Sequence, residues 1–83
     1  MTVRKHITKN LYNLQQSGLS QFKTSDIQEL AYEYKNTYGK FLGSTETYTR
    51  EFRRMRQEGV LEVEKMKTKG RQQTWKLKFI MPF

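Results

Sequence analysis

The sequence lacks cysteine altogether and contains a single histidine and a single proline among its 83 residues. Without cysteine it has no disulfide, no thiolate nucleophile and no cysteine-ligated zinc site. The one histidine, His6, cannot build a multi-histidine zinc site, and the glycines do not form a phosphate-binding loop. No stretch approaches the ~20 consecutive apolar residues that cross a bilayer. We therefore expect no enzyme, no catalytic residue, no metal, no cofactor and no membrane-spanning segment.

Acidic residues are scarce relative to basic ones. The chain carries 16 lysines and arginines against 8 aspartates and glutamates, a net charge of +8. A strong positive excess in a small domain indicates a polyanionic partner, and nucleic acid is the usual one. An anionic membrane surface is the weaker alternative, because no predicted helix sets a broad apolar face against lysines. Absence of cysteine is usual in the cytosol, so we expect an intracellular protein of the cytoplasm, nucleoid or nucleus.

Apolar residues recur at helical spacing over three segments and alternate with polar residues over two more. The helical spacing predicts helices over residues 4–16, 25–37 and 45–58. The alternation predicts strands over residues 60–66 and 72–80, joined by a polar tip that contains Gly70. This order of elements predicts one α+β domain that spans residues 1–83.

The same periodicity predicts which side chains are buried. On the third helix they are Tyr48, Phe52 and Met55, and the turn before this helix is expected to insert Phe41 and Leu42 into the core. The predicted inward positions of the last strand are Trp75, Leu77 and Phe79. The core is therefore expected to be small and rich in aromatic side chains.

Shorter patterns refine this picture. Ser25 followed by Gln28 is a capping-box pattern, which predicts that Ser25 caps the second helix. Phe22, in the short extended stretch before this helix, is expected to turn inward, and Tyr38 to continue the apolar stripe at its end. We expect His6 to lie on the surface of the first helix.

The outward face of the third helix is rich in arginine. At about 100° per residue, the side chains on this face are Arg50, Arg53, Gln57 and Glu46, and those on its flank are Arg54 and Thr47. Arginine pairs bidentately with guanine, glutamine pairs with adenine, and threonine contacts phosphate or the thymine methyl group. A helix with such a face fits the major groove of duplex DNA. The alternative is an ordinary solvated face, but a merely solvated helix interleaves both charge signs more evenly.

The predicted hairpin is the second basic feature. Residues 65–78 include no acidic residue and six basic ones, namely Lys65, Lys67, Lys69, Arg71, Lys76 and Lys78. Such dense positive charge becomes favourable beside phosphates, which predicts contacts to the nucleic-acid backbone that do not depend on sequence. The alternative is that the lysines protect an exposed strand edge. Glu62 and Glu64 share one strand face, and we expect them to pair with these lysines rather than bind a metal.

The order helix, link, helix, turn, helix and hairpin resembles the winged helix-turn-helix family. The most similar stretch runs from Phe52 to Leu61, where apolar and basic residues close the third helix and a glycine leads into the hairpin. The resemblance covers the whole chain in element order and implies a winged-helix fold, with 45–58 as recognition helix and 67–71 as wing tip. It also implies binding of double-stranded DNA in a regulatory or accessory role. Together with the charges, it assigns the DNA contacts to Thr47, Arg50, Arg53, Arg54, Gln57, Lys67, Lys69, Arg71 and Lys76.

Two other functions fit the same sequence. Winged-helix domains also serve as protein-interaction adaptors, and the apolar end of the chain is a candidate contact for a protein partner or a second copy in a homodimer. The residues of this apolar end are Ile80, Met81 and Phe83. RNA binding is the other alternative, but binding of single strands usually requires exposed aromatic side chains for stacking. Most aromatic residues here occupy predicted core positions.

Overall fold

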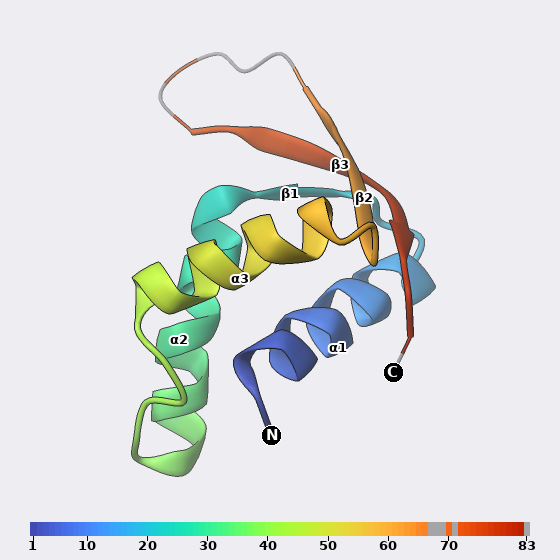
Figure 1. The fold of residues 1–83 in the computed structure, drawn as a ribbon. Helices are drawn as coiled ribbons and strands as arrows, with labels where there is room; N and C mark the ends of the chain where they lie inside the picture. The colour runs from blue at the N-terminus through green and yellow to red at the C-terminus, as the bar shows by residue number, and fades with distance from the viewer. Residues whose placement is uncertain (67–69, 71, 83) are drawn as a thin grey trace.

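Three helices lie beneath a three-stranded antiparallel sheet in the computed structural model, which describes residues 1–66, 70 and 72–82 (Figure 1). In chain order the elements are α1 (Val3–Gln16), β1 (Gln21–Lys23), α2 (Thr24–Tyr38), α3 (Thr45–Gln57), β2 (Leu61–Lys65) and β3 (Thr74–Ile80). Each helix begins and ends within one residue of its predicted bounds, and each predicted strand begins one or two residues late. The described residues therefore form a small α+β domain whose element order is compatible with a winged helix.

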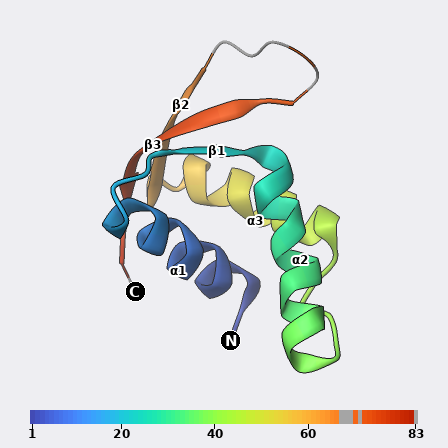
Figure 2. The ribbon, with the colours of Figure 1, turned by 180° about the vertical axis from the view of Figure 1, so that it is seen from behind.

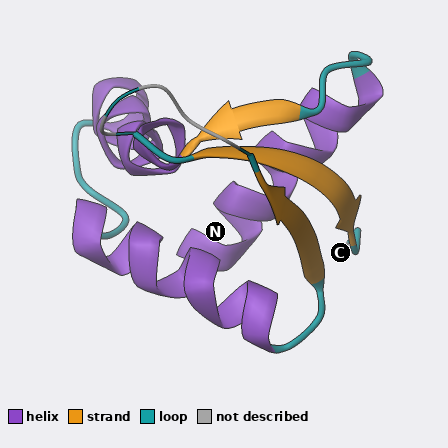
Figure 3. Cartoon of the chain, turned by 90° about the horizontal axis from the view of Figure 1, so that it is seen from above, coloured by secondary structure: helices purple, strands orange, loops and turns teal. Residues whose placement is uncertain are grey.

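The sheet has the strand order β1-β3-β2, so β3 lies between the other two strands (Figure 3). The sequence predicted only a two-stranded hairpin, but β1 pairs with the free edge of β3 and adds a third strand. This pairing sets Phe22 opposite Trp75. Phe22 is buried, which confirms that this short stretch turns its phenyl ring inward. Of the predicted tip, Gly70 is described, whereas residues 67–69 and 71 lie outside the described residues.

An irregularity in the strand pairing changes which side chains of β3 face the helices. The pairing with β2 skips Lys78, because Glu62 lies opposite Phe79 and the next residue of β2 lies opposite Leu77. An extra residue in one strand reverses the alternation of side chains beyond it. Ile80 is consequently buried and Phe79 is 40% exposed, so the prediction that Phe79 faces inward is wrong.

The two ends of α2 are set by different interactions. The helix ends at Gly39, whose φ of 77° is a left-handed conformation that favours glycine. At its start, the carboxylate of Asp26 accepts the backbone N–H of Lys23 at 2.8 Å. The prediction that Ser25 caps the helix is wrong, because Ser25 lies inside it and donates its hydroxyl to Gln72 Oε1 at 3.1 Å. This last bond ties the start of α2 to the hairpin.

The core is formed by buried residues of all three helices and of the sheet, and α3 contributes the largest side chains on the helical side. Tyr48, Phe52 and Met55 are each at most 1% exposed, which confirms the predicted buried face of α3. The Phe52 ring meets the rings of Phe22 and Trp75 edge to face, with centroids 5.8 and 5.6 Å apart. Such aromatic pairs add to the stabilisation that burial alone gives.

Two aromatic side chains that were expected in the core lie instead on the surface near the end of α2. Phe41 is 47% exposed and meets the ring of Tyr32 edge on, with centroids 5.7 Å apart. Tyr38 is 62% exposed and packs on Tyr34. Leu42, the other side chain of the turn that was expected in the core, is partly buried. The prediction that Phe41 fills the core is wrong, because its ring packs against Tyr32 and Lys35 on the surface of α2.

His6 is half-buried rather than on the surface, which corrects the prediction. Its Nδ1 lies 2.6 Å from the Tyr48 hydroxyl, and its ring is edge on to Tyr34. Burial lowers the pKa of His6, an effect that Glu33 opposes and Lys9 reinforces. Burial also raises the pKa of Tyr48 to about 12. The fold therefore favours a neutral His6 beside a protonated Tyr48.

Acidification is expected to destabilise the fold through His6. Its pKa in the folded state is below its ordinary value of 6.5, so the unfolded chain binds the proton more readily. The stability that the neutral His6 contributes is fully present above its ordinary pKa of 6.5, and it is lost as the pH falls through the pKa of the folded state. Urea titrations from about pH 8 to about pH 5, above the range in which carboxylates protonate, should show a falling free energy of unfolding. His6→Gln should flatten this dependence, and an unchanged dependence in the variant would contradict the assignment.

Candidate nucleic-acid interface

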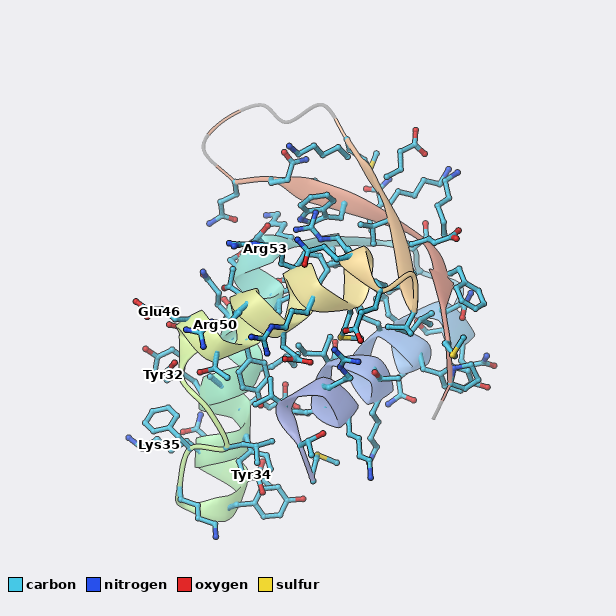
Figure 4. The ribbon with its side chains drawn as sticks, viewed as in Figure 1. Tyr32, Tyr34, Lys35, Glu46, Arg50 and Arg53 are labelled. Atoms are coloured by element: carbon cyan, nitrogen blue, oxygen red, sulfur yellow. The ribbon has the colours of Figure 1, made fainter. Side chains whose placement is uncertain are left out.

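The outward face of α3 carries two arginines that form no ion pair within the described residues. Arg50, Arg53 and Gln57 are exposed on the side of the helix opposite its buried face. In Figure 4, Glu46, Arg50 and Arg53 follow one another along α3. Among the described residues, neither Arg50 nor Arg53 takes part in an ion pair. The three side chains predicted to point outward thus lie together on one face.

A hollow lies beside these arginines, between α2 and α3. Its volume is about 310 Å³, and it is lined by Gln28, Glu46, Thr49, Arg50 and Arg53. Gln28 Nε2 donates to Thr49 Oγ1 at 3.4 Å, from one helix to the other. Amide, hydroxyl, carboxylate and guanidinium groups are the ones that contact base edges in the major groove. Gln28 and Thr49 could not be assigned to this face from the sequence, because only the packing of α2 on α3 brings them there.

Two acidic residues at the end of α3 are bound from the other side by α1. Arg4 Nε donates to Glu51 at 2.6 Å, and its terminal nitrogens donate to Glu58. Hydrogen bonding to Glu58, and then to Glu51, raises the pKa of Arg4. The bond from Arg4 lowers the pKa of Glu58. Because α1 occupies both carboxylates, neither of them neutralises Arg50 or Arg53.

Two of the predicted contacts, Thr47 and Arg54, lie on the flank of α3 that faces α1. Arg54 Nη1 is 3.9 Å from Glu51, the carboxylate that α1 also binds. Thr47 belongs to the helix cap, since its backbone N–H donates to Ser44 Oγ at 3.1 Å and the two hydroxyls are 2.9 Å apart. The structure therefore does not bring these two side chains together with Arg53.

The two faces of the hairpin carry different lysines. Lys65 lies opposite Trp75 in the strand pairing, so it shares the face that covers the helices. Lys76 alternates with Trp75 and lies on the outer face, away from the arginines of α3. On this outer face Lys78 Nζ is 3.2 Å from Glu64, which confirms the predicted pairing of this glutamate with a lysine. The same prediction for Glu62 is wrong, because Glu62 lies opposite Phe79 and forms no ion pair among the described residues. The other predicted contacts of the hairpin, Lys67, Lys69 and Arg71, lie outside the described residues.

Arg56 is the one basic residue of α3 for which the sequence pattern predicts no role. It is partly buried, and its guanidinium carbon lies 4.8 Å from the centroid of the Phe52 ring and 4.6 Å from that of Trp75. Arg56 follows Phe52 by four residues, and residues at this spacing are neighbours on a helix surface. That spacing is the signal in the sequence that places Arg56 beside the core.

A second surface is formed by exposed aromatic side chains at the end of α2 and in the turn after it. Tyr32 is 55% exposed, and Lys35 Nζ lies 4.8 Å from the centroid of the Phe41 ring. In Figure 4, Tyr32 and Lys35 both lie on α2. The exposed aromatic residues of the described chain are Tyr12, Tyr32, Tyr38, Phe41 and Phe79. The expectation that most aromatic residues occupy the core is therefore wrong.

The apolar end of the chain is only partly available to a partner. Ile80 is 3% exposed and belongs to the core, so its side chain offers little surface to a partner. Met81 is 50% exposed, and with Val60 and Pro82 it lines a hollow of about 310 Å³ against α1. Phe83 lies outside the described residues.

Other kinds of site find little support in the geometry. In the part of the chain that the structure describes, no three histidine, aspartate or glutamate side chains are grouped so that they could hold a metal ion. None of the helices in that part combines the length and the apolar character that crossing a bilayer requires. Comparison with protein-family models, with curated proteins and with solved structures finds no match to this chain.

Proposed function

We propose that this domain binds double-stranded DNA in the manner of a winged helix. α3 enters the major groove and presents Arg50, Arg53 and Gln57 to base edges. The hairpin lies along the phosphate backbone and contributes affinity that does not depend on sequence. A domain of this kind serves a regulatory or accessory role at DNA.

The observation that supports this proposal most strongly is the uncompensated positive charge of α3. Arg50, Arg53 and Arg56 form no ion pair among the described residues, whereas α1 binds Glu51 and Glu58 of the same region. Like charges on one helix repel each other, and the phosphates of a duplex relieve this repulsion. The major groove is wide enough to admit an α-helix, so the charged face fits the partner in shape as well as in sign.

Fluorescence anisotropy with a short mixed-sequence duplex tests the proposal directly. Contact with about five phosphates predicts a slope near −4.5 in a plot of log affinity against log salt concentration. Selection of bound duplexes from a random pool then shows whether the domain also prefers a sequence, and a palindromic result would identify a dimer. Failure to bind any duplex even at low salt would contradict the proposal.

The tip of the hairpin is expected to carry part of this salt dependence. Neutralising Lys67 and Lys69 to glutamine should reduce the magnitude of the slope by about 1.8, because each phosphate contact contributes about 0.9. Affinity should fall alike for all duplexes, since phosphates carry no sequence information. The matched control replaces Lys5 and Lys9 of α1 by glutamine, which changes the net charge equally at exposed positions outside the hairpin. An unchanged slope in the tip variant would remove the tip from the contact surface.

A second candidate function is binding of single-stranded nucleic acid by the exposed aromatic surface. Tyr32 and Phe41 lie beside Lys35 there, and each base that stacks on an aromatic ring contributes about 1–3 kcal/mol. Tyr32→Ala together with Phe41→Ala should then weaken binding of single strands and leave duplex binding unchanged. Equal affinity of the variant and the unmodified domain for single strands would exclude this function.

A further inference from the structure

Where α3 meets the hairpin, two basic side chains lie beside the ring of one tryptophan. The guanidinium carbon of Arg56 lies 4.6 Å from the centroid of the Trp75 ring, and Lys65 Nζ lies 6.0 Å from the same centroid. Trp75 is fixed in place, because its indole N–H donates to Thr24 Oγ1 at 2.9 Å. The ring of Phe52 also contacts this arginine, with its centroid 4.8 Å from the guanidinium carbon of Arg56. The aromatic rings thus hold the arginine in a defined orientation.

Arg56 has no counter-ion within the chain's acidic side chains. All eight aspartates and glutamates lie among the described residues, and none of them forms an ion pair with Arg56. Its Nε is buried and has no hydrogen-bond partner in the described part of the chain. Burial, and secondly the charge of Arg53, lowers the pKa of Arg56. The surroundings therefore lack the negative charge that this cation requires.

Packing alone accounts for only part of this arrangement. Stacking on two aromatic rings stabilises a guanidinium that is partly removed from water, which explains why Arg56 remains in place. Lys65, the cross-strand partner of Trp75, brings a second cation to the same ring, and the two like charges repel. A phosphate explains both residues, because it accepts hydrogen bonds from a planar guanidinium and from an ammonium group at once.

We propose that Arg56 and Lys65 together bind one backbone phosphate of the duplex in the angle between α3 and the hairpin, an inference that rests on the proposed function. The rings of Phe52 and Trp75 orient the guanidinium. The phosphate connects the helix in the groove to the hairpin beside it. Because the contact is to the backbone, it fixes the position of α3 without selecting a base.

Salt-dependent duplex binding of Arg56→Gln, Lys65→Gln and the double variant tests this site. Each single change should weaken binding by about tenfold on every duplex and reduce the magnitude of the salt slope by up to about 0.9. Because the two residues share one phosphate, the double variant should lose less affinity than the product of the two single losses. Lys9→Gln makes the same change in charge on α1 and should leave the slope unchanged.

The outcomes separate this site from the function on which it rests. Two results would contradict the shared phosphate and leave the proposed duplex binding intact. One is a salt slope that is unchanged in both single variants. The other is a loss of affinity in the double variant equal to the product of the two single losses. If the unmodified domain binds no duplex, the proposed function fails and this site with it. Circular dichroism identifies a variant that does not fold, and in that case Lys65→Gln decides the question, because Lys65 is exposed and outside the core.

Discussion

Replacing both Arg50 and Arg53 by alanine is expected to weaken binding of the preferred duplex by about 2–6 kcal/mol. Each bidentate contact between arginine and guanine discriminates by about 1–3 kcal/mol, and two such contacts are lost. Both side chains are exposed, and neither is paired with a carboxylate of the described chain. Binding of mixed-sequence duplex should weaken less, because only the attraction to phosphates is reduced there.

The control for this variant carries Lys5→Ala and Lys9→Ala. Both lysines are exposed on α1, which packs against the C-terminal end of β3 and lies away from the end of β2 and the start of β3 (Figure 2), and the change in net charge is the same. We expect this control to bind both kinds of duplex nearly as well as the unmodified domain. Equal losses on the preferred and the mixed duplex in the arginine variant would show that α3 contacts phosphates without contacting bases.

Phe52→Ala is expected to destabilise the fold by about 3–5 kcal/mol, the usual cost of removing a buried phenyl ring. Phe52 is 1% exposed and contacts the rings of Phe22 and Trp75 from two strands, so its loss opens the contact of α3 with the sheet. A domain of this length is stable by about 4–12 kcal/mol, so much of its stability would be lost. Urea titration measures the change as a lower midpoint.

Phe41→Ala is the matched control for this core substitution. It removes the same atoms from a ring that is 47% exposed, so we expect a change below about 1 kcal/mol. Comparable destabilisation by the two substitutions would contradict the division between core and surface aromatic residues described above.

The helices could be predicted from the sequence because their apolar residues recur at a spacing that a helix buries on one side. On α3 this spacing identified Tyr48, Phe52 and Met55, and the positions between them then had to face outward. The outward placement of Arg50 and Arg53 follows from that alone. The basic face of α3 is therefore the part of the candidate site that the sequence predicts best.

The remaining features depend on contacts between segments that are distant in the sequence. Phe79 is exposed because β2 skips Lys78 when it pairs with β3, and no pattern within one strand reveals this. Arg56 acquires its second aromatic neighbour only when β3 brings Trp75 to the end of α3. His6 meets Tyr48 only where α1 packs on α3. Each of these is a property of the packed molecule, beyond the reach of local periodicity.

The central claim is that one surface, formed by the outward side of α3 and the helix-facing side of the hairpin, binds the duplex. Titration of the ¹⁵N-labelled domain with duplex DNA, followed by nuclear magnetic resonance, tests it residue by residue. The largest shift changes should occur at Arg53, Arg56 and Lys65, with little change at Asn13 on the exposed side of α1. Largest changes on α1, or on the outer face of the sheet at Lys76, would contradict the claim.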